Sequence, residues 1–324
     1  MPNTSLLSIR NLDVCYTTDN GTVQAVSGLN LSIKKGQTLG LVGETGAGKT
    51  TMAMSVMRLI ASPPGKITGG EIFFEGTDLL KTSDSAMRKV RGGKIAMIFQ
   101  DPMTSLNPIM PVDEQVAEMV ALHNKQSKQE SLKRALAMLE LVGIQPDRAG
   151  EYPHQFSGGM KQRVVIAIAL ACNPALLIAD EPTTALDVTI QAQVLELMKG
   201  LKEQFNTAMI MITHDLGIVA ETCDHVAIMY AGRIVEEADT TSLYANPRHP
   251  YTQGLFASIP NVKEERESLA VIPGLPPEPT DIPSGCPFHP RCSHAMERCK
   301  VEKPKPVVVS DGHVVACFLE GGAS

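Results

Sequence analysis

Residues 43–50 read Gly-Glu-Thr-Gly-Ala-Gly-Lys-Thr, and this glycine-rich stretch constrains the fold more than any other part of the chain. A short apolar run over residues 38–42 precedes it, and a helical pattern over residues 50–60 follows. A glycine loop between a buried strand and a helix N-terminus can curl its backbone N–H groups around phosphate. The sequence therefore predicts an α/β protein with a P-loop NTPase core that binds ATP.

The loop supplies most of the expected nucleotide contacts. Lys49 can reach the β- and γ-phosphates, and the Thr50 hydroxyl can ligate Mg²⁺. The predicted binding residues here are Gly43, Glu44, Thr45, Gly46, Ala47, Gly48, Lys49, Thr50 and Thr51.

Polar residues follow three of the predicted strands. The apolar strand at residues 176–179 ends in Asp180 and Glu181, the strand at residues 95–99 ends before Gln100, and His214 follows the strand at residues 208–213. Ligands of open parallel sheets collect at the carboxyl ends of strands, so these side chains are predicted to face the γ-phosphate. Asp180 is placed to hold Mg²⁺ from the second shell, and Glu181 to act as the general base for water.

A second anion site is predicted at Ser157, Gly158 and Gly159, which precede an apolar helical run. A helix that starts with a hydroxyl and two glycines presents free N–H groups and the positive end of its dipole. One ATPase with two phosphate-binding surfaces requires an explanation.

The composition excludes several classes of protein. A net charge of −6 and an aromatic content of 4% argue against a protein that binds nucleic acid through its phosphates or by base stacking. No apolar run reaches the roughly 18 residues of a membrane span, and the N-terminus does not resemble a signal peptide. We expect a cytosolic protein that reaches a membrane only by docking to a spanning partner.

The end of the chain differs in composition. Residues 260–284 are rich in proline and read as a linker, and four cysteines follow: Cys286, Cys292, Cys299 and Cys317. Disulfides are disfavoured in a reducing cytosol, so the cysteines predict a metal site. Their spacing matches neither zinc ribbons nor bacterial ferredoxins, which leaves Fe–S, zinc with His289 and His294 as spare ligands, and metal-free thiols open.

The order of these motifs resembles that of the ATP-binding subunit of ABC transporters. Residues 43–50 are similar to the Walker A loop, Gln100 to the Q-loop, residues 157–162 to the family signature and residues 176–181 to Walker B. Ala185-Leu186-Asp187 resembles the D-loop, His214 the switch histidine, and Tyr16 the aromatic that stacks on adenine. Over residues 6–240 the resemblance implies an ATPase core with an antiparallel β subdomain and a helical subdomain, with Glu181, His214 and Gln100 in catalysis and Gln100 also near Mg²⁺.

The resemblance also explains the second anion site. In that family two subunits close head to tail, and ATP lies between the Walker A loop of one and the Ser-Gly-Gly helix of the other. Residues 157–159 would then serve the ATP of a partner chain.

Three further segments resemble the subgroup of oligopeptide and dipeptide importers: residues 99–108, residues 248–252 and the terminal cysteine region. The resemblance implies an ABC ATPase domain over residues 1–245 and a C-terminal extension over residues 246–324. It also implies a heterodimer with a second ATPase subunit, two transmembrane permease subunits, an extracytoplasmic binding protein, a place at the cytoplasmic face of the membrane, and a structural [4Fe–4S] cluster on the four cysteines.

The predicted function is ATP hydrolysis coupled to the uptake of peptides. Importers of nickel, glutathione or sugar stay open, because other subunits choose the cargo. A soluble ABC ATPase acting on ribosomes or DNA would need two cassettes or a large inserted coiled coil, and a subunit with a dead site would lack Lys49, Glu181 or His214. The sequence has neither of the first two features and retains all three residues.

Overall fold

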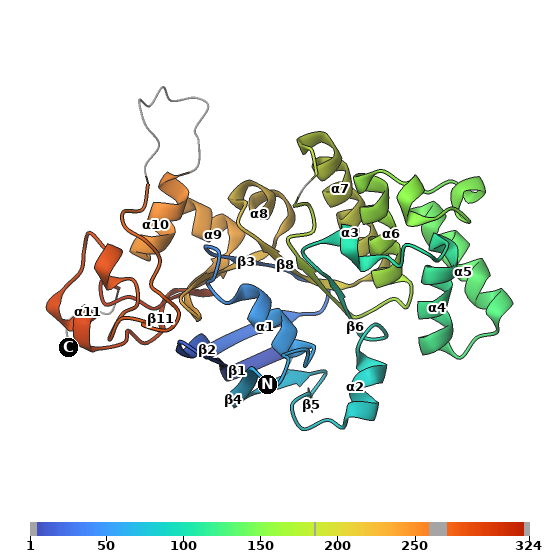
Figure 1. The fold of residues 1–324 in the computed structure, drawn as a ribbon. Helices are drawn as coiled ribbons and strands as arrows, with labels where there is room; N and C mark the ends of the chain where they lie inside the picture. The colour runs from blue at the N-terminus through green and yellow to red at the C-terminus, as the bar shows by residue number, and fades with distance from the viewer. Residues whose placement is uncertain (1–4, 185, 259–270, 321–324) are drawn as a thin grey trace. The chain divides into compact units, whose positions relative to one another are not determined.

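The computed structural model describes residues 5–184, 186–258 and 271–320. The predicted linker therefore lies partly outside the described residues. The described chain divides into two compact units: Lys34–Thr38 with Lys81–Met211, and Ser5–Ile33 with Leu39–Leu80 and the described part of Ile212–Ser324. Each unit combines sheet and helix (Figure 1).

The first unit is mainly helical and carries short parallel strands. Its elements are α2 (Asp84–Val90), β6 (Ile95–Ile98), α3 (Pro102–Ser105), α4 (Val112–Asn124), α5 (Lys128–Leu141), α6 (Gly158–Leu170), β7 (Leu176–Asp180), α7 (Val188–Phe205), the start of β8 (Ala208–Thr213), and two 3₁₀ turns at Pro146–Arg148 and Pro153–Gln155. β6 pairs with β7 in parallel, with Ile98 opposite Ala179, so both strands end at the same edge. Every residue of β7 is buried, as expected for a strand covered on both faces.

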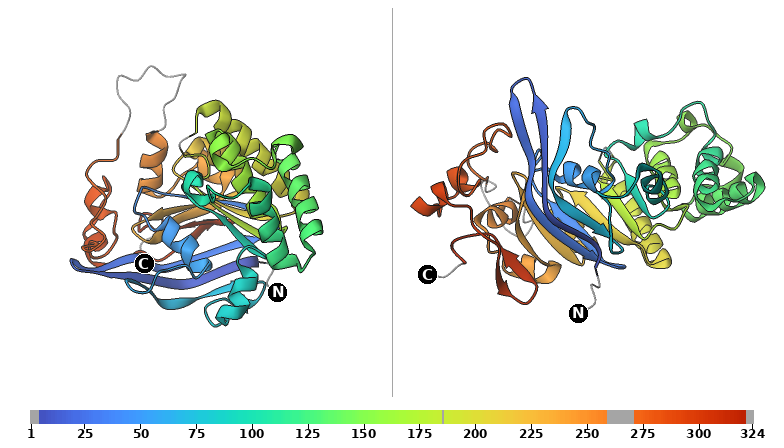
Figure 2. Two further views of the ribbon diagram at one scale, coloured as in Figure 1. Left: turned by 45° about the vertical axis from the view of Figure 1, so that its right-hand side comes forward. Right: turned by 90° about the horizontal axis from the view of Figure 1, so that it is seen from below.

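The second unit begins with two 14-residue strands, β1 (Ser5–Thr18) and β2 (Gly21–Lys34), which run side by side in Figure 2. They form the antiparallel sheet β2-β1-β4-β5 with β4 (Gly65–Phe74) and β5 (Thr77–Asp78). Leu7, Ile9 and Val14 are buried on β1. This sheet matches the antiparallel β subdomain that the resemblance implied, and its first two strands are long.

The remaining strands of the second unit form the order β11-β12-β10-β9-β3. The elements of this part are β3 (Thr38–Val42), α1 (Lys49–Val56), α8 (Leu216–Thr222), β9 (His225–Tyr230), β10 (Arg233–Asp239), α9 (Thr240–Ala245), α10 (Pro250–Ala257), a 3₁₀ turn at His289–Arg291, α11 (Glu297–Val301), β11 (Val307–Ser310) and β12 (His313–Val315). β3 pairs with β9 in parallel, and a hairpin joins β9 to β10 through Ala231 and Gly232, both with positive φ. β12 pairs with β10, so the end of the chain extends this sheet.

Two helix predictions need correction. The helix after the glycine loop ends at Val56 and not at residue 60, because Arg58 has a φ of 49° and leaves the helical region. The apolar spacing of residues 112–142 is typical of continuous helix, yet this stretch forms two helices. Lys125 (φ 51°) ends α4, and a capping box between Ser127 and Glu130 starts α5.

Within the described residues, no helix has the length and apolar character needed to cross a lipid bilayer.

Candidate functional site

The glycine loop sits between β3 and α1, as predicted. Gly46 has a φ of 82° and Gly48 a φ of 100°, which side-chain-bearing residues rarely adopt. At Gly48 a Cβ would also overlap the backbone carbonyl of Ala25, and at Gly43 that of Met229. The loop therefore needs glycine at these positions for both conformation and space, and its turn brings the N-terminus of α1 to the phosphate-binding position.

The Lys49 side chain folds back over this loop. Its Nζ donates hydrogen bonds to the carbonyl oxygens of Gly43 (2.6 Å) and Glu44 (3.0 Å), and the residue is 7% exposed. Thr45, Gly46 and Thr50 are exposed beside it. A buried ammonium group behind exposed backbone amides forms a concentrated positive site suited to phosphate.

Tyr16 lies near the end of β1, opposite Gly65 on β4, and is half-buried. A Cβ at Gly65 would lie 2.8 Å from Cε1 of Tyr16, so the glycine leaves room for the ring. The partial exposure of the ring argues against a purely core role and is consistent with stacking on a base.

The acidic strand end and the glutamine lie together in the first unit. Nε2 of Gln100 donates a hydrogen bond to Oε2 of Glu181 over 3.0 Å, and the Thr184 hydroxyl donates to the same oxygen over 3.1 Å. Glu181 has a φ of 47°, an uncommon conformation for a residue other than glycine and one found often at functional sites. The preceding Asp180 is 2% exposed.

The signature segment also lies in the first unit. Ser157 is the N-cap of α6, and its Oγ accepts the Met160 N–H over 3.4 Å, which confirms the predicted helix start. Gly158 packs near Leu186, and a Cβ at Gly159 would press on Ile190 of α7.

In the predicted D-loop, Ala185 lies outside the described residues. His214 follows β8 and is exposed. His214, Tyr16 and the glycine loop belong to the second unit, whereas Gln100, Asp180 and Glu181 belong to the first.

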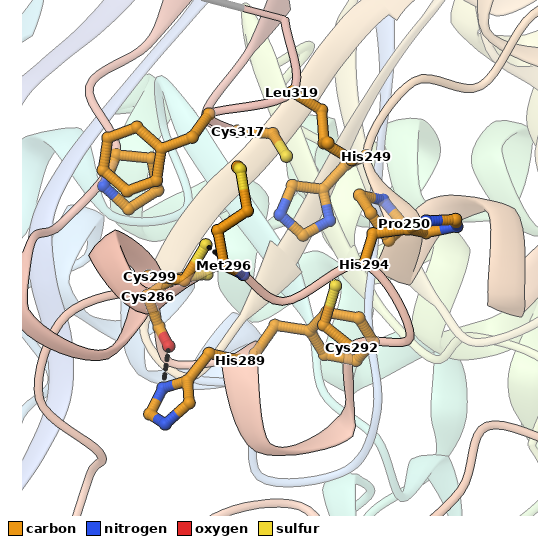
Figure 3. A pocket seen from close by; sticks show the side chains of 13 residues that line it. His249, Pro250, Cys286, His289, Cys292, His294, Met296, Cys299, Cys317 and Leu319 are labelled. Atoms are coloured by element: carbon orange, nitrogen blue, oxygen red, sulfur yellow. Dashed lines mark hydrogen bonds between the residues drawn. The ribbon is translucent and has the colours of Figure 1, made fainter.

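The four terminal cysteines line one pocket in the second unit (Figure 3). All four are free of disulfides, and His289, His294 and Met296 line the same pocket. However, no group of three or more His, Cys, Asp or Glu side chains among the described residues could hold a metal ion. The predicted metal-binding unit is therefore not confirmed.

Burial dominates the chemistry of these thiols. It raises the pKa of the Cys286 and Cys292 thiols, and it raises the pKa of Cys317 to about 11. Burial therefore disfavours the thiolate forms of Cys286, Cys292 and Cys317.

His249 adds a polar atom to this pocket that the sequence did not single out. Its Nδ1 accepts the Tyr251 N–H over 3.0 Å, so Nε2 carries the proton of the neutral ring. Burial lowers the pKa of His249 to about 4, and Nε2 has no hydrogen-bond partner among the described residues. An unpaired buried donor beside four sulfurs calls for an acceptor.

Two residues far along the chain contact the phosphate loop, and sequence reasoning missed both. The Tyr251 hydroxyl accepts the Glu44 N–H over 3.0 Å, and Arg291 forms an ion pair with the Glu44 carboxylate. Neither residue stands in a motif that names a nucleotide contact, and each lies more than 200 residues from the loop. No local signal in one sequence could have identified them.

Comparison with known proteins places these features in a family. Residues 26–184 match the ABC transporter family, and residues 235–299 match the family described as the oligopeptide/dipeptide transporter, C-terminal region. The chain is 52% identical to the oligopeptide transport ATP-binding protein OppD of Bacillus subtilis (98% of this chain, 89% of that protein). It is 49% identical to the dipeptide transport ATP-binding protein DppD of the same organism (97% of this chain, 95% of that protein).

The fold agrees with solved structures of ATP-binding cassettes. The cassette MJ0796, solved as a dimer in a post-hydrolysis state with ADP and Pi, aligns with a TM-score of 0.65 at 29% identity over 72% of this chain and 98% of that one. The cbiO1 protein of Clostridium perfringens aligns with the same TM-score over 75% of this chain and 92% of its own. The resemblance to ABC subunits and the mixed α/β cassette fold are thereby confirmed, and the chain belongs to the ABC transporter family as an ATPase cassette followed by the oligopeptide/dipeptide transporter C-terminal region.

Proposed function

We propose that this chain is the ATP-hydrolysing subunit of an importer of dipeptides and oligopeptides. The observation that carries the ATPase part of the proposal is the hydrogen bond from Gln100 to Glu181 at the shared edge of β6 and β7. The peptide cargo is supported by the match over residues 235–299 and by relatives named for oligopeptide and dipeptide transport that align over nearly the whole chain. No feature of the chain favours nickel, glutathione or sugar.

Each site residue has a proposed role in this reaction. The backbone of residues 43–51 and Lys49 hold the phosphates, and Tyr16 stacks on adenine. Thr50 and Gln100 would hold Mg²⁺, with Asp180 in the second shell, and the ion would supply positive charge to neutralise the charge that develops on the phosphates.

Glu181 is the proposed general base. Gln100 and Thr184 hold its carboxylate by two hydrogen bonds, which orient the group for a water molecule. His214 contacts the γ-phosphate in this proposal.

The proposed assembly contains a second ATPase subunit, two transmembrane permease subunits and an extracytoplasmic binding protein, at the cytoplasmic face of the membrane. Its support is the helix start at Ser157–Gly159, which we interpret as an anion site in addition to the phosphate loop of the same chain. In a head-to-tail pair, these residues would hold the γ-phosphate bound to the partner. We keep the boundary between cassette and extension at residues 245 and 246, where α9 ends.

Replacement of the base tests the proposal directly. Glu181→Gln keeps the hydrogen-bonding shape but removes the basic oxygen, so Mg-ATP binding should persist while turnover falls by at least about a hundredfold. ATPase activity and uptake of labelled peptides are measured with the assembled transporter in vesicles. Glu196→Gln, on the exposed side of α7, is the matched control and should behave as the unaltered chain. Undiminished hydrolysis by Glu181→Gln would remove Glu181 from this role, and transport of another cargo in place of peptides would overturn the proposed substrate.

We propose in addition that Cys286, Cys292, Cys299 and Cys317 hold a [4Fe–4S] cluster, with zinc as the alternative. Cysteine thiolates are the usual ligands of such a cluster, and these four residues would hold it. Support comes from the four free cysteines around one pocket, and from the orphaned His249 Nε2, which would donate to a sulfur atom of the cluster. When bound, the cluster would cross-link the segments of the extension that carry the cysteines.

Purification under anaerobic conditions tests the cluster. The protein should be brown, with about four iron and four sulfide per chain. Cys317→Ser should lose most of both, whereas Cys15→Ser, outside the pocket, should retain them. A colourless chain loaded with zinc would overturn the cluster in favour of the alternative.

A further inference from the structure

Arg291 connects the C-terminal extension to the phosphate loop. Its two terminal nitrogens donate to the two carboxylate oxygens of Glu44, over 2.8 and 3.0 Å. Nε of Arg291 donates to the Pro273 carbonyl over 3.0 Å, and the side chain is only 6% exposed. This two-pronged geometry is the strongest form of an arginine–carboxylate pair, and the pairing raises the pKa of Arg291 further above its usual value.

Three groups of Glu44 therefore form hydrogen bonds: its backbone N–H, its backbone carbonyl and its carboxylate. Its N–H bonds to the Tyr251 hydroxyl, its carbonyl oxygen accepts from Lys49, and its carboxylate binds Arg291. Two of these three partners belong to the extension. The second residue of the phosphate loop is consequently fixed from outside the motif that contains it.

An aromatic cluster keeps these partners in place. The ring of Tyr251 lies 4.6 Å from that of Tyr230 and 5.4 Å from that of Phe288, centroid to centroid. Arg291 packs over Tyr230 at 5.8 Å and also donates to its hydroxyl over 3.3 Å. Tyr230 and Tyr251 are almost completely buried, so their rotamers are fixed by packing.

Charge gives this arrangement a consequence for the reaction. Glu44 places a carboxylate in a loop whose proposed task is to bind a highly anionic triphosphate. Left unpaired, that carboxylate would repel the nucleotide, whereas the Arg291 pair cancels its charge.

We propose that Arg291 is a positioning residue of the nucleotide site, which neutralises Glu44 and fixes the first turn of the phosphate loop. The inference rests on the proposed function of that loop. The extension then contributes to ATP affinity through Arg291 and Tyr251, in addition to anything its cysteines bind.

The test measures the dissociation constant of Mg-ATP for the full-length chain by titration with a fluorescent analogue. Arg291→Ala should raise the constant roughly tenfold, and Arg291→Lys, which keeps the charge but loses the two-pronged geometry, by less. Tyr251→Phe keeps the ring and should raise it about threefold through loss of one hydrogen bond. Lys300→Ala removes an exposed cation paired with Glu297 in the same extension and should change nothing.

A double variant distinguishes two explanations for the effect of Arg291: neutralisation of the Glu44 charge, and a purely structural contact between the extension and the loop. Adding Glu44→Gln to Arg291→Ala removes the unpaired carboxylate, so the affinity should return to within about threefold of Glu44→Gln alone. An unchanged dissociation constant in Arg291→Ala would overturn the proposal, as would an equal loss in the double variant. If Arg291→Ala does not fold, Arg291→Lys and the double variant decide the question by the same comparison. Failure of the unaltered chain to bind Mg-ATP would remove the phosphate-loop assignment, and this proposal with it.

Discussion

The phosphate loop and the cysteine pocket lie in the same unit but are built in different ways. The loop takes its shape from eight consecutive residues and presents mostly backbone groups. The pocket takes its four sulfurs from a stretch of more than thirty residues and adds His249 from the start of α10. The class of ligand can be predicted from sequence when a site is built from the backbone of consecutive residues. When a site is built from dispersed side chains, the sequence indicates a ligand but does not identify it.

Replacement of Lys49 is expected to have the largest effect, and it tests the difference between the phosphate loop and the cysteine pocket. Lys49→Ala removes the cation of the loop and its bonds to Gly43 and Glu44, so Mg-ATP affinity should fall roughly a hundredfold. Iron and sulfide content should stay unchanged, because the pocket does not share this residue. Lys35→Ala, at an exposed turn before β3, serves as the control. Retained affinity in Lys49→Ala would remove Lys49 from nucleotide binding.

A smaller effect concerns the attachment of the extension. The buried carboxylate of Glu236 on β10 accepts hydrogen bonds from the backbone of Arg248 and His249 and from Nε2 of His313 on β12. Glu236→Gln places an amide N–H against these donors and should lower the free energy of unfolding by about 2–4 kcal/mol.

Urea denaturation followed by circular dichroism measures this loss. The neighbouring Glu237→Gln is the control, since its partner His225 lies in a more exposed pair and the loss should stay below about 1 kcal/mol. Equal effects of the two variants would contradict the view that the Glu236 cluster anchors the extension.

Much of the fold could be predicted from local pattern. The apolar runs of β7 and β8, the Ser157 cap and the β9–β10 turn are short-range signals, and the structure has each of them in place. The errors occurred where a single residue changes the backbone: Arg58 and Lys125 end helices by adopting positive φ, a choice that apolar periodicity does not encode.

The residues of the candidate site also differ in whether their contacts could be predicted from the sequence. Gln100 and Glu181 could be paired in advance because parallel strands end at one edge, and their hydrogen bond agrees with that reasoning. The contacts of Glu44 with Tyr251 and Arg291 could not, because they depend on how distant segments pack. The same holds for His249, whose neighbours along the chain give no indication of a sulfur-lined pocket.

The Glu44–Arg291 pair has a practical consequence for protein engineering. A shortened chain that stops after residue 245 would retain every nucleotide motif, yet it would leave the Glu44 carboxylate without Arg291 and uncover the ring of Tyr230, which packs against Tyr251 and Phe288 of the extension. A chimera would lose the same pair wherever the donor extension has no arginine at the position of Arg291. The phosphate loop and the extension should therefore be transferred together in any engineered chain, so that Glu44 keeps its partner Arg291.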